Sequence, residues 1–139
     1  MKISTKGRYG LTIMIELARQ YGNGPRSLKS IAKEKNLSAH YLEQIAAPLR
    51  NARLIRSVRG AYGGYTLAEE PSDIRAGDII RVLEGPITPV EGIEEEEAAQ
   101  QALWMRIRDV VRDVLDTTTL YDLIEYDSHE VQKEHMFYI

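Results

Sequence analysis

The chain has 139 residues and no cysteine, a length that suits one domain with an appended element and a composition that excludes disulfides, cysteine-ligated zinc and ordinary iron–sulfur clusters. Its formal net charge of −3 hides a split, because residues 1–67 hold twelve Lys/Arg and three acids (+9) whereas residues 68–139 hold six Lys/Arg and eighteen acids (−12). A basic half is typical of nucleic-acid binders and phosphates repel an acidic half, so any nucleic acid is expected to contact only the first half.

Three helices are predicted in the basic half. The first covers residues 4–20, the second runs from its cap Ser27 through Lys35, and the third begins after Ser38. Two short helices joined by a tight turn match a helix-turn-helix unit. Pro48 lies inside the third helix, which predicts either a bend or a separate last turn. The apolar stripe of this helix is formed by Leu42, Ile45, Ala46 and Leu49.

A change of hydrophobic period follows the third helix. Residues 55–58 and 65–67 are short strand-like runs, and the glycine-rich segment between them suits a tight β connection. A fourth helix is expected over residues 76–84, where Gly85 and Pro86 stop it. A helix-turn-helix followed by a hairpin is a winged helix, so the predicted fold is mainly α with a two-stranded β wing and a long C-terminal dimerisation helix.

The acidic half is expected to hold the contacts of a homodimer. Residues 98–116 are strongly periodic, and their apolar stripe is too broad for the first domain to bury alone, so the simplest partner is the same helix of a second chain. The predicted dimer face consists of Leu103, Trp104, Ile107, Val110, Val111, Val114 and Leu115. The chain therefore divides into a winged helix-turn-helix domain (1–85), an acidic linker (86–97) whose run of glutamates 94–97 begins the long helix, dimerisation helices (98–127) and a C-terminal tail (128–139).

The third helix and the wing carry the candidate DNA contacts. On the outer face of that helix, Gln44 can bond adenine and Glu43 can accept from cytosine. A solvated helix face is the commoner fate of such residues, but the basic hairpin that follows favours DNA, since an arginine such as Arg59 can enter the minor groove. The predicted contact set is Lys6, Arg8, Tyr9, Ser27, Ser38, His40, Tyr41, Glu43, Gln44, Arg50, Arg56, Arg59, Gly60, Tyr62, Gly63 and Gly64.

No group of residues has the pattern of a catalytic or metal site. His129 and His135 are six positions apart, which matches neither spacing of one helix face. No apolar stretch approaches the roughly 20 residues of a membrane span, so a cytoplasmic location is expected. The alternative to a DNA-binding repressor is a winged-helix adaptor that binds only protein, and a small ligand-binding enzyme is a third reading.

Four segments resemble the Rrf2 family of bacterial transcription regulators. They are MKISTKGRYGL at the N-terminus, YLEQ at 41–44, VRGAYGGYTL at 58–67 and GDIIRVLEG at 77–85. The resemblance implies a dimeric winged-helix regulator that binds double-stranded DNA. It implies that Tyr41, Glu43 and Gln44 read the major groove and that Arg59, with its glycines, reads the minor groove.

Two departures from the family pattern bear on function. Many members carry three cysteines in the segment matching residues 86–105 and bind an iron–sulfur cluster there, whereas this chain has Pro89, Glu91, Gly92 and the glutamates 94–97. No cluster and no other cofactor is therefore expected. Arg53 stands where the family often has glycine. If that position requires a positive φ, either Arg53 is strained or the turn differs from that of the family.

Within the family, the cysteine-free middle and the ending MFYI look most like the branch that represses cysteine metabolism in Gram-positive bacteria. That likeness implies cysteine synthase, the O-acetylserine thiol-lyase, as a co-repressor that senses O-acetylserine; a family regulator of another signal is the alternative. Cysteine synthase accepts the isoleucine-ended tail of serine acetyltransferase. The ending Met136, Phe137, Tyr138 and Ile139 could mimic that tail, or could pack onto the dimer.

Overall fold

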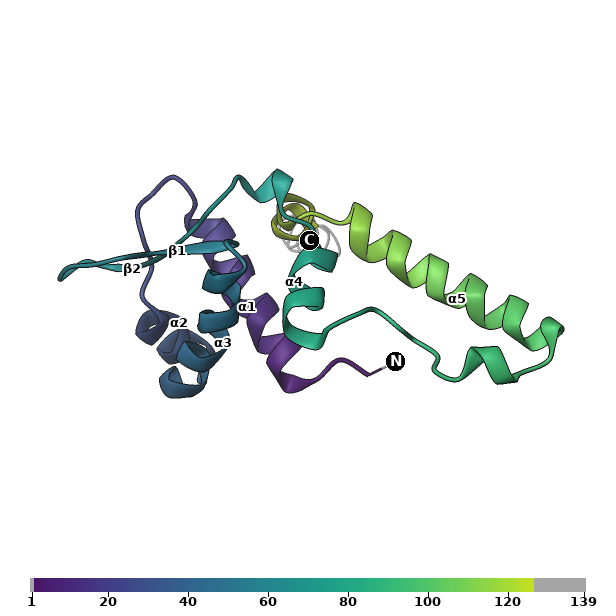
Figure 1. The fold of residues 1–139 in the computed structure, drawn as a ribbon. Coiled ribbons are helices and arrows are strands. Elements are labelled where there is room, and N and C mark those ends of the chain that lie inside the picture. Colours follow the sequence, from purple (N-terminus) through teal and green to yellow (C-terminus); the bar gives the residue numbers. More distant parts are fainter. Residues whose placement is uncertain (1, 127–139) are drawn as a thin grey trace, which may run out of the picture.

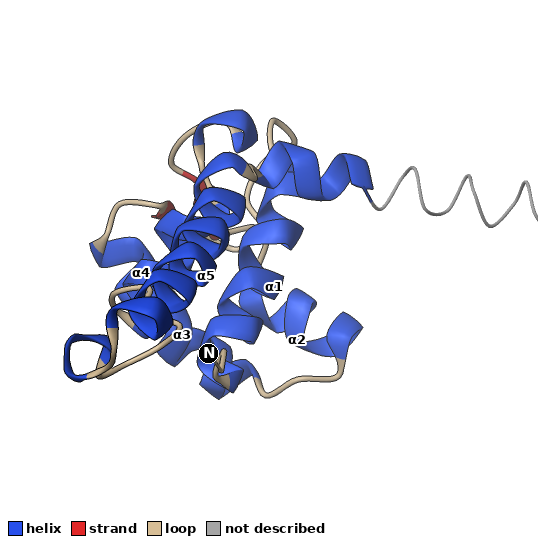
Figure 2. Cartoon of the chain, turned by 90° about the vertical axis from the view of Figure 1, so that its right-hand side faces the viewer, coloured by secondary structure: helices blue, strands red, loops and turns tan. Residues whose placement is uncertain are grey.

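The computed structural model describes residues 2–126 and has a helical body with one hairpin (Figures 1 and 2). In chain order the elements are α1 (Thr5–Gln20), α2 (Leu28–Lys35), α3 (Ala39–Asn51), β1 (Ile55–Val58), β2 (Gly64–Leu67), the short 3-10 helix η1 (Pro71–Asp73), α4 (Ala76–Glu84), a second 3-10 helix η2 (Ile93–Glu95), α5 (Ala98–Thr117) and a helical segment at 120–126. Figure 1 shows the hairpin projecting from one end of the molecule and α5 leading away at the other, with α4 between them. The predicted winged helix is confirmed.

Serine caps fix where the first three helices begin. The hydroxyl oxygens of Ser4, Ser27 and Ser38 accept hydrogen bonds from backbone N–H groups three residues later, at 3.3, 3.1 and 3.2 Å. Each such cap satisfies one otherwise unpaired donor of the first turn and contributes about 1 kcal/mol. The short polar residues that precede each apolar stripe therefore set the boundaries of the helix-turn-helix.

The core lies where α1 packs against α3 and α4. Ile13, Met14 and Leu17 of α1 are fully buried there. The predicted stripe of α3 is buried along its whole length, and α3 continues as one helix through Pro48. Of the two outcomes expected for that proline, a separate last turn is wrong.

The wing is an antiparallel hairpin whose register runs from the pair Ile55 and Leu67 at its base to the pair Val58 and Gly64 near its tip. The base pair is buried and anchors the hairpin on the core. A third segment joins the hairpin edge, because Arg26 and Tyr65 exchange backbone hydrogen bonds of 3.0 and 2.9 Å. The loop before α2 therefore holds the wing against the helix-turn-helix.

The linker differs from the prediction in one respect. The glutamates at 94–97 do not begin the long helix: η2 takes the first two, and α5 starts at Ala98 after Glu97 as its N-cap residue. The first turn of α5 contains no acid. Gly92 at φ 70° turns the chain just before η2, so Glu94 and Glu95 lie in η2 and only Glu97 borders the start of α5.

After α5 the chain returns to the winged helix. Thr119 and Asp122 cap the segment 120–126 reciprocally, with hydrogen bonds of 3.0 and 3.1 Å. Leu120 is fully buried in the core of the first domain, and its N–H donates to the carbonyl of Ile74 at 2.9 Å. The C-terminal end of α5 is therefore tied to the winged helix, whereas its N-terminal end contacts the linker helix η2. None of the helices in the described part of the chain is long and apolar enough to cross a membrane.

Candidate nucleic-acid interface

The outer face of α3 presents polar side chains to solvent. His40, Glu43 and Gln44 are exposed, and the side-chain nitrogens Nε2 of Gln44 and His40 lie 3.3 Å apart. Tyr41 is half-buried, and its ring meets that of Tyr9 edge-on with centroids 5.7 Å apart and planes at 79°. The tyrosine pair joins α1 to α3, so these two predicted contacts also have a packing role.

Tyr65 of β2 connects the wing to α3. Its phenol donates to Glu43 Oε2 at 3.5 Å and also interacts with Arg50, and both partners belong to α3. Burial and the Glu43 carboxylate raise the pKa of the Tyr65 phenol, and Arg50 opposes the shift. The phenol therefore stays protonated and available as a donor. Tyr65 was not among the predicted site residues, since nothing in the local sequence shows that this strand position faces α3.

The wing exposes its arginines and one aromatic ring. Arg59 and Tyr62 lie in the loop at its tip, where Tyr62 is 93 % exposed, and Arg56 is exposed on β1 near its base. An arginine on such a narrow projection suits insertion into a minor groove. Gly60 has φ 119°, which only glycine adopts readily.

Two further glycines of the wing have structural reasons of their own. A Cβ on Gly63 would overlap the carbonyl oxygen of Val58, and one on Gly64 would overlap the backbone of Arg26. Close backbone approach therefore requires glycine at both positions, whether or not DNA touches them.

The remaining predicted contacts lie at helix starts. Lys6 and Arg8 are exposed on the first two turns of α1. Ser27 and Ser38 use their hydroxyl oxygens as caps, which leaves each hydroxyl hydrogen free to donate to a phosphate.

A buried carboxylate that the sequence did not reveal lies behind this surface. Glu16 of α1 is 3 % exposed and pairs with Arg19, with Arg26 at 2.5 Å and with Lys35 at 3.2 Å. Burial alone would raise the pKa of the Glu16 carboxyl, but the hydrogen bonds from Lys35 and Arg26 and the charge of Arg19 lower it overall. Arg26 also pairs with the exposed Glu34, so the cluster joins α1, the loop that holds the wing, and α2.

The predicted dimer face separates into two groups. Leu103, Ile107, Val110 and Val114 are exposed by 48, 39, 63 and 56 % and lie on one side of α5. Trp104, Val111 and Leu115 are half-buried, and the Trp104 indole donates to Glu96 Oε2 at 3.1 Å. The exposed group forms an apolar stripe, which we call the α5 stripe.

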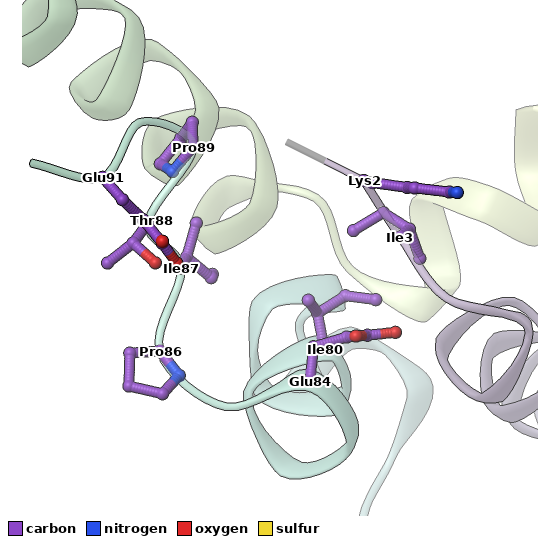
Figure 3. A pocket seen from close by; sticks show the side chains of 9 residues that line it. All are labelled: Lys2, Ile3, Ile80, Glu84, Pro86, Ile87, Thr88, Pro89 and Glu91. Atoms are coloured by element: carbon purple, nitrogen blue, oxygen red, sulfur yellow. The ribbon is translucent and has the colours of Figure 1, made fainter.

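A cavity of about 280 Å³ lies at the linker. Figure 3 shows the N-terminal residues Lys2 and Ile3 on one side, the linker on the other, and Ile80 and Glu84 of α4 between them. The Glu84 carboxylate accepts from the backbone N–H of Ser4 at 2.9 Å. The polar side chains that line the cavity are a lysine, a threonine and two carboxylates. Nowhere in residues 2–126 do three or more metal-binding side chains gather. These residues do not fit an iron–sulfur cluster, which requires thiolates.

Taken together, a helix-turn-helix, a hairpin tipped with arginine and a polar helix face define a winged-helix DNA-binding regulator. The chain matches over residues 3–126 the family described as "Rrf2: Iron-dependent Transcriptional regulator". It is 68% identical to the HTH-type transcriptional regulator CymR of Bacillus subtilis, and the match covers 100% of both chains. This protein therefore belongs to the Rrf2 family and is a transcriptional regulator, not an enzyme.

Solved structures agree with this assignment. The structure of CymR, the global cysteine regulator of B. subtilis, matches with a TM-score of 0.87 and 69% identity over 91% of this chain and 98% of that one. The oxidized form of Staphylococcus aureus CymR matches with a TM-score of 0.80 and 65% identity over 91% and 98%. The predicted tail contacts at 136–139 lie outside the described residues.

Proposed function

We propose that this regulator represses genes of cysteine and sulfur metabolism by binding operator DNA as a homodimer. The observation that carries the proposal is the exposed polar face of α3 beside an arginine-tipped wing, in a chain 68% identical over its full length to a protein named CymR. Residues of α3 would enter the major groove and Arg59 the adjacent minor groove. Two such units related by a two-fold axis suit a pseudo-palindrome with half-sites one or two helical turns apart.

A salt titration tests DNA binding directly. Fluorescence anisotropy with upstream fragments of cysteine-metabolism genes should show affinity that falls steeply between about 50 and 200 mM salt, as several phosphate contacts require. A shuffled fragment of the same length should bind more weakly at every salt concentration. A winged-helix adaptor that binds only protein would show neither the affinity nor the difference between fragments.

The α5 stripe supports the homodimer. Four large apolar side chains on one helix face exceed the scattered exposure usual on a monomer, and an identical helix offers a self-complementary partner. Light scattering on the purified chain should give twice the monomer mass of 15.8 kDa.

Cysteine synthase is the proposed co-sensor, and the C-terminal residues Met136 to Ile139 are its proposed contact. The proposal rests on the apolar character of the segment MFYI, since a short apolar peptide can dock in the groove of a partner. A pull-down with cysteine synthase, with and without O-acetylserine, should show binding that O-acetylserine weakens. Unchanged binding after deletion of residues 136–139 would overturn the proposed role of the tail.

We propose further that the regulator works without an iron–sulfur cluster. The chain lacks cysteine, and the linker cavity offers no thiolate. Anaerobically purified protein should contain no stoichiometric iron or acid-labile sulfide, and chelators should leave operator binding unchanged.

A further inference from the structure

Three arginines line one cavity at the base of the wing. Arg50 comes from the last turn of α3, Arg53 from the turn that follows and Arg56 from β1, and the cavity between them measures about 470 Å³. All three arginines are exposed, and Glu69 is the single acid among the lining residues. Three arginines and one glutamate among the lining residues leave this cavity with an excess of positive charge.

This basic cavity continues the surface that would read bases. Arg50 follows Glu43 by seven residues, so both lie on one face of α3, about 10 Å apart along its axis. Tyr65 interacts with both residues and links them across the wing. A duplex seated on the front half of α3 therefore passes close to the cavity.

The backbone conformation at Arg53 favours glycine over arginine, so the geometry of the turn does not explain the arginine. Its φ is 63°, in the left-handed region that glycine adopts without a steric penalty and arginine does not. The turn is closed by backbone bonds alone, from Arg53 N to Arg50 O at 2.9 Å and from Leu54 N to Leu49 O at 3.0 Å. Within residues 2–126 the Arg53 guanidinium has no hydrogen bond or ion pair. Its side chain therefore adds strain without an internal contact in return.

We propose that Arg53 completes, with Arg50 and Arg56, a site for a backbone phosphate of operator DNA next to the major-groove contacts of α3. The planar guanidinium presents paired donors that match two phosphate oxygens. The site rests on the proposed DNA binding and adds Arg53 to the contact surface. Because a phosphate gives no sequence information, the site strengthens binding to every DNA sequence alike.

The variant Arg53→Gly removes the cation and also relieves the backbone strain. The operator Kd reports the loss of the cation, and Tm reports the relief of the strain. Its Tm should rise, while its operator Kd increases about tenfold and the slope of log K against log salt becomes shallower by about 0.9. Arg53→Lys, which keeps the charge, should recover most of the affinity. Lys2→Ala removes one exposed cation at the linker cavity and should leave the operator Kd within about twofold.

The outcomes also separate the possible sources of the phosphate. If wild-type protein binds the operator and Arg53→Gly binds equally well with the same salt slope, the phosphate site is wrong. If Arg53→Gly loses binding of inorganic phosphate in calorimetry but keeps operator affinity, the cavity serves a free anion and the DNA contact is overturned. If wild-type protein itself shows no salt-dependent operator binding, the proposed function fails first.

Discussion

Neighbouring residues at the tip of the wing have different roles, one structural and one in binding. Gly63 lies too close to the Val58 carbonyl to carry a side chain, and the hairpin needs it with or without DNA. Arg59 is exposed and has no packing role of this kind. A pattern of arginine and glycines therefore contains both structural and binding residues, and substitution at each position separates them.

Arg59→Ala tests the binding role at the wing. The operator Kd should rise by at least tenfold, with little change in Tm, because an exposed side chain is removed.

Gln44→Ala tests base recognition by α3. In this variant the Kd values for the operator and for operators that differ from it by one base pair should become more similar, since a bidentate base contact provides about 1–3 kcal/mol of discrimination. Anisotropy titrations against a panel of single-base variants distinguish the two effects, and unchanged binding in both would contradict this docking of α3 and the wing.

Glu16→Gln tests the buried ion cluster. Removing the charge leaves cations that were paired with a buried carboxylate, so the free energy of unfolding should fall by about 3 kcal/mol. Glu34→Gln removes the exposed partner of the same Arg26 and should cost under about 1 kcal/mol. Urea denaturation provides both values, and equal costs would show that burial of Glu16 contributes nothing.

The same cluster predicts a dependence on pH. Because the pKa of Glu16 is lower in the folded chain than its ordinary value of 4.5, its stabilisation is complete above that value and is lost as pH falls through the folded pKa. In denaturation curves below about pH 4.5, Glu16→Gln should therefore lose less stability per pH unit than the wild-type chain. Parallel slopes for the two proteins would contradict the assignment.

At the scale of elements, one close contact fixes how α5 leaves the body. Arg81 of α4 donates to both carboxylate oxygens of Asp116 in α5, at 2.6 and 2.8 Å, and this pair lies over Gly77. The hydrogen bond from the Arg81 guanidinium is the main cause of a lowered pKa of the Asp116 carboxyl, which keeps the pair charged. Glycine at 77 lets the two helices approach closely enough for the pair to form.

Gly77→Ala should loosen this junction. The added methyl overlaps Asp116 Oδ1, so we expect a loss of about 1–2 kcal/mol in the free energy of unfolding. In an Asp116→Ala background the same change should cost much less, because the overlapping atom is gone. A thermal-denaturation double-mutant cycle measures this coupling, and identical costs in the two backgrounds would rule out the proposed contact.

At the scale of the whole molecule, the charge split corresponds to a division of surfaces. The basic half forms α1, α2, α3 and the wing, and the acidic half forms α4, the linker and α5. Figure 1 shows the wing and α5 at opposite ends of the molecule, with α4 between them. Leu120 qualifies this division, because it belongs to the acidic half and is buried in the core of the first domain. The α5 stripe is therefore presented by a helix whose C-terminal end is fixed to the winged helix through Asp116 and the segment that holds Leu120.

Val110→Asp tests the α5 stripe. A charge in the centre of an apolar interface should convert the homodimer into a monomer by light scattering and weaken operator binding by at least tenfold, since paired half-sites are no longer held together. Ala102→Asp adds the same charge on a different, exposed side of α5 and should leave the dimer intact. A dimeric Val110→Asp variant would place the interface elsewhere.

The sequence by itself determined the elements and their chemistry. Serine caps, apolar periodicity and glycine placement act within a few residues, so the helix starts, the wing and the outer face of α3 followed from the printed chain. The likeness to known regulators in the wing motif pointed to the same function. At Arg53 the same likeness left either strain or a different turn, and the positive φ of the structure decides for strain.

Only the tertiary structure decided which distant residues meet. Glu16 was an ordinary charged residue until the fold buried it among cations from α1, α2 and the intervening loop. Tyr65 gained its contacts with Glu43 and Arg50, and Leu120 its place in the core, in the same way. Burial and long-range pairing depend on how separate elements pack, and local periodicity carries no information about that packing. The basic cavity around Arg53 is of both kinds, because its arginines are close in the sequence whereas Ala68 and Glu69 reach it only after the hairpin has folded back.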